Sequence, residues 1–270
     1  MTSRSLHVAV ELSPGAPAGT AMTAERAGFT FATFDDSPRL DAVTRAAYVA
    51  TRTDRLGLAV NVTTAEPLHL AARLASLDHA SHGRAAWVVG PGALHHEAAE
   101  VVEVVRRLWD SWDDDAVIEN QDPPITRRPP QGRLVVCASD ALAGAVRPDI
   151  VLVGGTGLDD VRTRARRARD TGAPLVFAEV EVRLGEAGRR PSGDRLRYTG
   201  SAPGLTELLG WLATSVDGVR LHFADPAAEL PAPAGEVLPA LRAEGLLTPP
   251  APGATLRASL GLPRPESVVA

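Results

Sequence analysis

The clearest candidate for ligand chemistry in the sequence is a glycine-rich turn, Gly154-Gly155-Thr156-Gly157. It follows an apolar run that ends at Val153 and precedes a stretch, residues 158–169, with the pattern of a helix. Backbone N–H groups at such a strand-to-helix turn bind phosphate well, and glycine lets them converge. The turn is therefore a candidate phosphate site. The alternative interpretation is an ordinary flexible loop between a strand and a helix.

The histidines and the single cysteine carry no comparable motif. Cys137 stands alone, which excludes an internal disulfide and every multi-cysteine metal motif. The pair His95-His96 lies on a predicted amphipathic helix, where such a pair usually faces solvent. The other histidines fall in different predicted elements without the spacing of metal ligands, namely His7, His69, His79 and His222. The sequence therefore predicts no metal site.

Eight short apolar runs alternate with helical patterns and would position these residues. The predicted strands are residues 6–12, 29–34, 56–60, 85–89, 134–137, 149–153, 174–182 and 218–223. Eight strands, most of them followed by a helix, in about 250 residues predict a (β/α)8 barrel. An open doubly wound sheet would normally have a glycine-rich dinucleotide turn after its first strand, and residues 13–17, SPGAP, do not form one. In a (β/α)8 barrel the active site forms at the C-terminal ends of the strands.

Composition narrows the class of protein further. A chain of 270 residues with 44% hydrophobic residues can bury one full core. We expect a single barrel over residues 1–245 and a tail, 246–270, that packs on it. The sequence has no apolar run long enough for a transmembrane helix and no signal-peptide cleavage site, so we expect a cytoplasmic protein. A net charge of −5, with both signs spread along the chain, indicates neither nucleic-acid nor membrane binding.

Four segments of the chain resemble one known family. EPLHLAARLASLDHASHGRAAW, from residue 66 to residue 87, resembles a segment of luciferase-like flavin-dependent monooxygenases, and of the nitrilotriacetate monooxygenase branch in particular. VVEVVRRLWDSWDDDAV, PPQGRLVV and TLRASLGLPRPE resemble further segments of that branch and follow in the family order. The loops between them are shorter than is usual in the branch. The resemblance independently implies a barrel.

The resemblance also implies flavin contacts at two strand ends. Asp36 falls on an aspartate that contacts the flavin at the end of the family's second strand, although it could instead cap the helix that follows. Asn61 and Thr63 lie where the family places small hydroxyl residues beside the isoalloxazine ring, although Asn61 departs from the usual serine or threonine. The alternative for this pair is a polar strand end without a ligand.

Further implied contacts follow along the chain. Gly90 ends the fourth predicted strand, in a segment that has lost the polar residues usual in the branch. Ser139 keeps the hydroxyl group of the family's phosphate-binding turn, and the turn at Gly154, Gly155 and Thr156 lies one strand later. His95 aligns with a flavin-contacting tyrosine and is the one candidate catalytic residue.

The function that the resemblance implies is a flavin-dependent monooxygenase. It would use O2 and reduced FMN, supplied by a separate flavin reductase, on a small organic substrate, as a homodimer or heterodimer. The first alternative is a non-catalytic subunit that supports the flavin-holding barrel of a heterodimer, because several flavin-contacting positions and the long loops are lost. The second alternative is a deazaflavin-dependent oxidoreductase.

Overall fold

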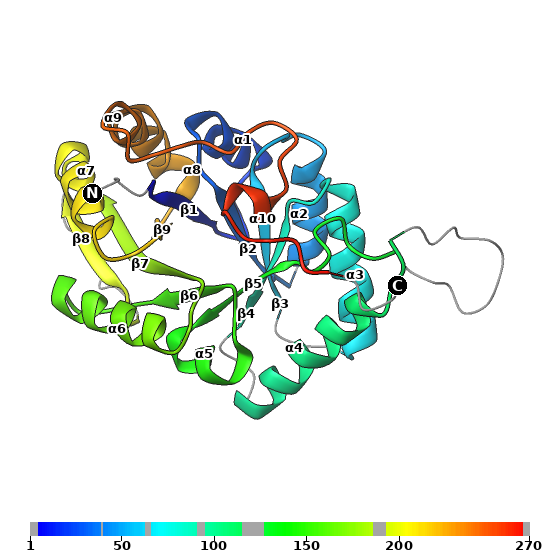
Figure 1. The fold of residues 1–270 in the computed structure, drawn as a ribbon. Coiled ribbons are helices and arrows are strands. Elements are labelled where there is room, and N and C mark those ends of the chain that lie inside the picture. The colour runs from blue at the N-terminus through cyan, green and yellow to red at the C-terminus, as the bar shows by residue number, and fades with distance from the viewer. Residues whose placement is uncertain are drawn as a thin grey trace.

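The computed structural model describes residues 5–38, 40–62, 66–90, 95–114, 127–185 and 193–266. Within these ranges, strands and helices alternate around a central barrel (Figure 1). The strands are β1 (His7–Leu12), β2 (Phe31–Asp35), β3 (Gly57–Val62), β4 (Ala85–Val89), β5 (Val135–Ser139), β6 (Ile150–Val153), β7 (Leu175–Leu184), β8 (Leu196–Gly200) and β9 (Gly218–His222). Residues 63–65, 115–126 and 186–192 lie among those outside the described ranges.

The barrel is closed by eight parallel strands, β1 to β7 and β9. Neighbouring strands pair in order from β1 to β7, β9 pairs with β7, and β1 closes the ring on β9 with His7 opposite Gly218. β8 is a ninth strand outside the ring. It pairs with Val180 to Leu184, the C-terminal part of β7. One edge of β7 pairs with β9, so β8 pairs with the opposite edge, whose N-terminal part pairs with β6. The (β/α)8 prediction is therefore confirmed, with one additional strand.

Helices cover the outside of the ring. They are α1 (Ala18–Ala27), α2 (Ala42–Ala50), α3 (Pro67–Ala80), α4 (His95–Asp110), α5 (Asp140–Val146), α6 (Leu158–Asp170), α7 (Ala202–Leu212), α8 (Pro226–Glu229), the π-helix η1 (Pro233–Val237), α9 (Leu238–Ala243) and α10 (Leu256–Ser259). Local sequence sets several of their ends. α2 starts where the Asp41 side chain accepts from the Thr44 amide, and α1 ends at Gly28, which adopts a left-handed φ of 95°.

Alternate residues of each strand belong to two separate cores. Ala9, Phe31 and Phe177 point into the ring, whereas Val8, Val10 and Ala32 pack under the helices. Because both faces of each strand are buried, the strands appear in the sequence as continuous apolar runs. Inside the ring, large side chains such as Phe31 and Phe177 pack beside small ones such as Ala9, so the centre of the barrel is filled with side chains.

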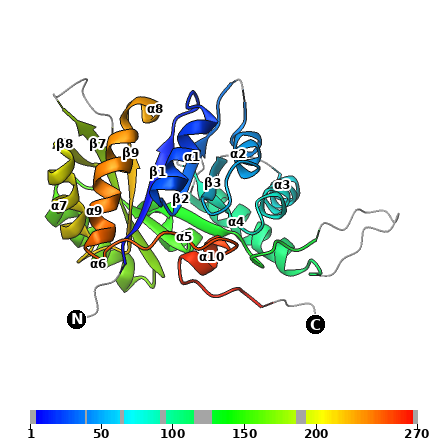
Figure 2. The ribbon, with the colours of Figure 1, turned by 90° about the horizontal axis from the view of Figure 1, so that it is seen from above.

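The N-terminal end of the ring is sealed by the C-terminal part of the chain. α10 lies beneath the barrel (Figure 2) and buries Leu256 and Leu260 in the interior core. A Cβ atom on Gly57 would lie 2.7 Å from a Leu256 methyl carbon, so only glycine allows this approach. Arg257 donates to both oxygens of Asp149, at 2.9 and 3.0 Å.

A buried polar corner stands beside this seal and contains the segment that carries the family resemblance. The Asp78 carboxylate accepts from the backbone amides of Ala85 and Gln131 and from the Gln131 side chain, at 2.7 to 3.2 Å. The Arg84 guanidinium donates to the carbonyl oxygens of residues 50, 53, 56 and 81. These bonds tie α2, α3, β4 and the segment before β5 into one unit.

The helix α5 and the strand β8 were not predicted, and neither were the four-residue helices α8 and α10. α5 has seven residues, DALAGAV, which is too short to show helical periodicity and contains Gly144. Every residue of β8 after Leu196 is at least partly exposed, because this strand lies outside the ring, and so it lacks the apolar run that marks the other strands.

Candidate active site at the barrel mouth

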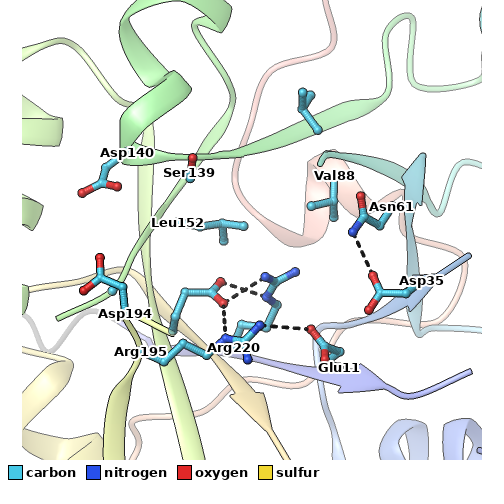
Figure 3. A pocket seen from close by; sticks show the side chains of 13 residues that line it. Glu11, Asp35, Asn61, Val88, Ser139, Asp140, Leu152, Asp194, Arg195 and Arg220 are labelled. Atoms are coloured by element: carbon cyan, nitrogen blue, oxygen red, sulfur yellow. Dashed lines mark hydrogen bonds and ion pairs between the residues drawn. The ribbon is translucent and has the colours of Figure 1, made fainter. Parts of the chain in front are cut away.

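A cavity of about 280 Å³ opens at the C-terminal ends of the strands (Figure 3). Every strand of the ring contributes one inward-facing residue to it: Glu11, Asp35, Asn61, Val88, Ser139, Leu152, Glu179 and Arg220, in ring order from β1 to β7 and then β9. Asp140, Gly154, Asp194 and Arg195 complete the polar part of the wall. This is the position at which (β/α)8 enzymes carry their active sites.

Buried ion pairs form the floor of the cavity on the β1, β7 and β9 side. Arg220 donates twice to Glu179, each bond 2.9 Å long. His222 lies between two carboxylates, with Nε2 2.6 Å from Glu179 and Nδ1 2.9 Å from Glu11. Arg195 reaches the same two glutamates at 3.6 and 3.9 Å (Figure 3). We call Glu11, Glu179, Arg195, Arg220 and His222 the floor network.

The floor network fixes the charge of its members. Burial alone would raise the pKa of Glu179, but the ion pairs with Arg220 and His222 outweigh it and lower this pKa. Burial lowers the pKa of His222, but Glu179 and Glu11 reverse the shift and raise it above the usual value. The pKa of Glu11 is lowered as well, so the network favours two ionised glutamates and a protonated imidazole.

Asp35, and not its neighbour Asp36, lines the cavity. The Asp35 carboxylate accepts from the Asn61 amide nitrogen at 2.9 Å on the wall opposite Asp194 (Figure 3). Asp36 is exposed, and its carboxylate accepts from the Ala42 amide at 2.8 Å, at the start of α2. The geometry thus gives Asp36 the helix-capping role that was the alternative in the sequence.

The other predicted ring contacts separate into two groups. Asn61 lines the cavity, and its buried Oδ1 atom has no hydrogen-bond partner among the described residues. Gly90 is buried directly after β4. Thr63 lies outside the described residues, as does the side chain of His95, whose backbone begins α4.

The two predicted phosphate turns lie at the opposite wall. Ser139 and Gly154 line the cavity, so both turns reach it. However, the Gly155 amide donates to the Asp194 carbonyl oxygen at 2.7 Å, and the Thr156 amide donates to the Asp160 carboxylate at 3.1 Å. Two amides of the glycine-rich turn, those of Gly155 and Thr156, thus have acceptors within the chain.

Sequence reasoning did not find most of the wall. It did not single out four charged residues of the wall, Glu11, Glu179, Arg195 and Arg220. All of these except Arg195 lie within or beside apolar runs, where a buried charge is costly. An isolated charge in a buried strand was the signal that could have found them. Arg195 gave no such signal, because it precedes β8 in a polar stretch.

Two further findings concern the described part of the chain as a whole. None of its helices combines the length and the apolar composition that crossing a bilayer requires. It also brings together no group of three or more histidine, cysteine or acidic side chains that could hold a metal ion.

The ring, its helices and the polar mouth define a (β/α)8 barrel of the enzyme type. A model of the luciferase-like monooxygenase family matches residues 12–179, and the chain belongs to this family. The family prediction made from the four segments is confirmed.

Similarity to individual proteins supports the same family assignment. The chain is 32% identical over 179 residues to a subunit of pristinamycin IIA synthase from Streptomyces pristinaespiralis, a match that covers 52% of this chain and 64% of that protein. It is 28% identical over 194 residues to nitrilotriacetate monooxygenase component A of Aminobacter aminovorans, a match that covers 56% and 41%. The chain thus spans less than two thirds of the length of these relatives.

Solved structures support the fold. The EDTA monooxygenase of Chelativorans sp. BNC1 superposes with a TM-score of 0.77 at 18% identity, over 97% of this chain and 99% of that one. The similarity is to the whole barrel and establishes the architecture.

Proposed function

We propose that the chain is a component of a flavin-dependent monooxygenase that acts on a small organic substrate at the barrel mouth. The observation that carries this proposal is the cavity to which all eight strands of the ring contribute. Such an enzyme inserts one atom of O2 into its substrate and releases the other as water, with electrons from a reduced flavin that a separate reductase supplies. The relatives support this proposal, since they are named as monooxygenase or synthase components.

The chain's own residues suit the ring-shaped part of a flavin or a substrate of similar size. The cavity volume of about 280 Å³ is close to the lower limit of about 300 Å³ for small-molecule sites. Val88 and Leu152 offer apolar surface that would exclude water, and Asp35 and Asn61 offer a polar edge that would orient a planar ligand. The turn at Gly154 disfavours a phosphate group, because the Gly155 and Thr156 amides and the neighbouring Arg164 are already engaged.

A second candidate is a subunit that supports the flavin-holding barrel of a partner. The specific observation in its favour is the floor network, which fills the centre of the mouth with ion pairs of this chain. The similarity to the pristinamycin IIA synthase protein supports it too, because that protein is named as one subunit of its enzyme. The aligned region covers a larger fraction of the pristinamycin IIA synthase subunit than of this chain, so that subunit is of similar or smaller length. The nitrilotriacetate monooxygenase component, by the same comparison, is longer than this chain.

The test of the first proposal is flavin binding, followed by quenching of flavin fluorescence. We expect riboflavin to bind, and Asp35→Ala to weaken its binding about tenfold, or 1.4 kcal/mol, because it removes the polar edge of the cavity. Asp36→Ala is the matched control. It changes the same charge one residue away but lies outside the cavity, so affinity stays unchanged.

The competing outcome is equally specific. A wild-type chain that binds neither oxidised nor reduced flavin, but raises the flavin-dependent turnover of a co-purified partner barrel, would refute the first proposal and establish the supporting subunit. Equal losses in the two aspartate variants would show that the flavin lies elsewhere.

A further inference from the structure

The backbone of Asp194 lies directly against the glycine-rich turn after β6. A Cβ atom on Gly154 would lie 1.8 Å from the Asp194 carbonyl oxygen, far inside any allowed contact. That oxygen accepts from the Gly155 amide at 2.7 Å. The space in front of this turn, where a ligand oxygen would have to approach the amides, is therefore filled by the chain itself. Because any side chain at position 154 would collide with the Asp194 carbonyl oxygen, only glycine fits there.

The side chain of Asp194 takes the neighbouring cation. Arg164 of α6 donates to both Asp194 oxygens and also lies 3.4 Å from Asp140 and 3.3 Å from Asp160. One guanidinium thus serves three carboxylates. A phosphate dianion placed between the two turns would face these three carboxylates, and Arg164, which lies among them, is already paired, so the carboxylates would repel it. In Figure 3, Asp140 and Asp194 lie on the same side of the pocket.

The opposite wall has no such obstruction. Asp35 forms no ion pair within 4.0 Å among the described residues, and it shares one of its oxygens with Asn61. Val88 and Leu152 lie between this polar edge and the acidic wall. The cavity therefore has one face that suits hydrogen-bond donors and apolar rings, and one face that rejects anions.

We propose that Asp194 occupies the subsite in which a ligand phosphate would otherwise lie, so that the mouth of this chain takes a phosphate-free ligand and does not anchor FMN. Its carbonyl oxygen replaces a phosphate oxygen on the Gly155 amide, and its carboxylate replaces the phosphate charge on Arg164. The ligand class is then an uncharged planar heterocycle, such as the riboflavin ring system, or an organic substrate of that size. The choice of this ligand class rests on the proposed function. The inference that Asp194 occupies the anion subsite does not depend on the proposed function.

The experiment compares riboflavin and FMN, which differ only in the phosphate, by isothermal titration with the intact chain. We expect FMN to bind no more tightly than riboflavin, and Arg164→Gln to leave both affinities unchanged. Asp194→Ala removes the carboxylate to which Arg164 donates twice and leaves only Asp140 and Asp160 beside this guanidinium. We expect the variant to bind FMN at least tenfold more tightly, while its affinity for riboflavin stays within twofold. Asp159→Ala is the matched control, because it removes an exposed acid from the same helix, and we expect it to change neither affinity.

Two results would overturn the inference. One is FMN binding to the wild type at least tenfold tighter than riboflavin, with a loss on Arg164→Gln that riboflavin does not share. The other is an Asp194→Ala variant, folded by circular dichroism, in which FMN gains nothing over riboflavin. If the wild type binds neither flavin, the ring site fails, but inorganic phosphate still decides the inference. A rise in phosphate affinity in Asp194→Ala supports it, and no rise refutes it.

Discussion

The two ends of this barrel use buried polar groups in opposite ways. At the N-terminal end, Asp78, Arg84 and Gln131 bond mostly to backbone groups, and most of these bonds join different parts of the chain. At the mouth, Glu179, Arg220 and His222 bond to one another and surround a cavity. The first arrangement stabilises a unique fold, whereas the second concentrates charge where a ligand can meet it. The segment that reveals the family lies at the first end, so the resemblance reports the scaffold more directly than the site.

The largest effect is expected at the N-terminal end. Arg84→Met removes donors from four backbone carbonyl groups that no solvent reaches, and we expect the free energy of unfolding to fall by about 5 kcal/mol. Urea unfolding measures this loss. Arg73→Met, which breaks an exposed pair with Asp41, is the control and should cost less than about 1 kcal/mol. Similar losses in the two variants would contradict the structural role of the corner.

We expect a slightly smaller loss of unfolding free energy when an ion pair at the mouth is broken. Arg220→Met leaves Glu179 buried without its strongest partner and should cost about 4 kcal/mol. In the double variant Glu179→Met/Arg220→Met no charge of the pair remains, and most of the loss should be recovered. Denaturant titration of both variants decides the point. If the double variant were the less stable of the two, the pair would be a structural support like the corner, and the contrast between the ends would fail.

The two ends should also titrate in different pH ranges. Burial raises the pKa of Asp78 to about 6, despite the hydrogen bonds that favour its ionised form. Between the unfolded pKa near 4 and this value, the folded chain binds more protons, so stability decreases as pH rises through this window, by up to about 3 kcal/mol. Unfolding free energies from pH 4 to pH 7 measure the slope. Asp78→Asn should flatten it, and an unchanged slope would assign the proton to another group.

We expect the smallest change in unfolding free energy at a pH above the range in which Asp78 titrates. The pKa of His222 is raised, so the stability that its protonated form provides is complete below the unfolded value of 6.5 and is lost as pH rises through the folded pKa. His222→Gln should remove this decline above pH 6.5. His69→Gln, at an exposed position, should retain it. A decline that persists in His222→Gln would show that the floor network does not depend on the protonated imidazole.

The sequence predicted the ring far better than the mouth. All eight ring strands were found because burial on both faces makes each a continuous apolar run. The same property hides which residues face inward. Asp36 was chosen from the family resemblance, whereas Asp35 is the residue that lines the cavity. Counting alternate residues from Phe31 would have corrected this choice. The engagement of Gly155 by Asp194 could not be predicted, since the two are separated by an intervening strand and helix and no local pattern relates them.

Closure of the ring on β9 has a consequence for the order in which the protein can fold during synthesis. β1 is synthesised before every other strand of the ring, but its second edge has no partner until Gly218–His222 is made. α10, which seals the base, follows later still. Throughout translation of the intervening chain, the growing sheet therefore presents an open, apolar edge, which is a site for mispairing with other chains. The rate of folding and the yield of this protein should therefore depend on how quickly the segment from β9 to α10 is synthesised.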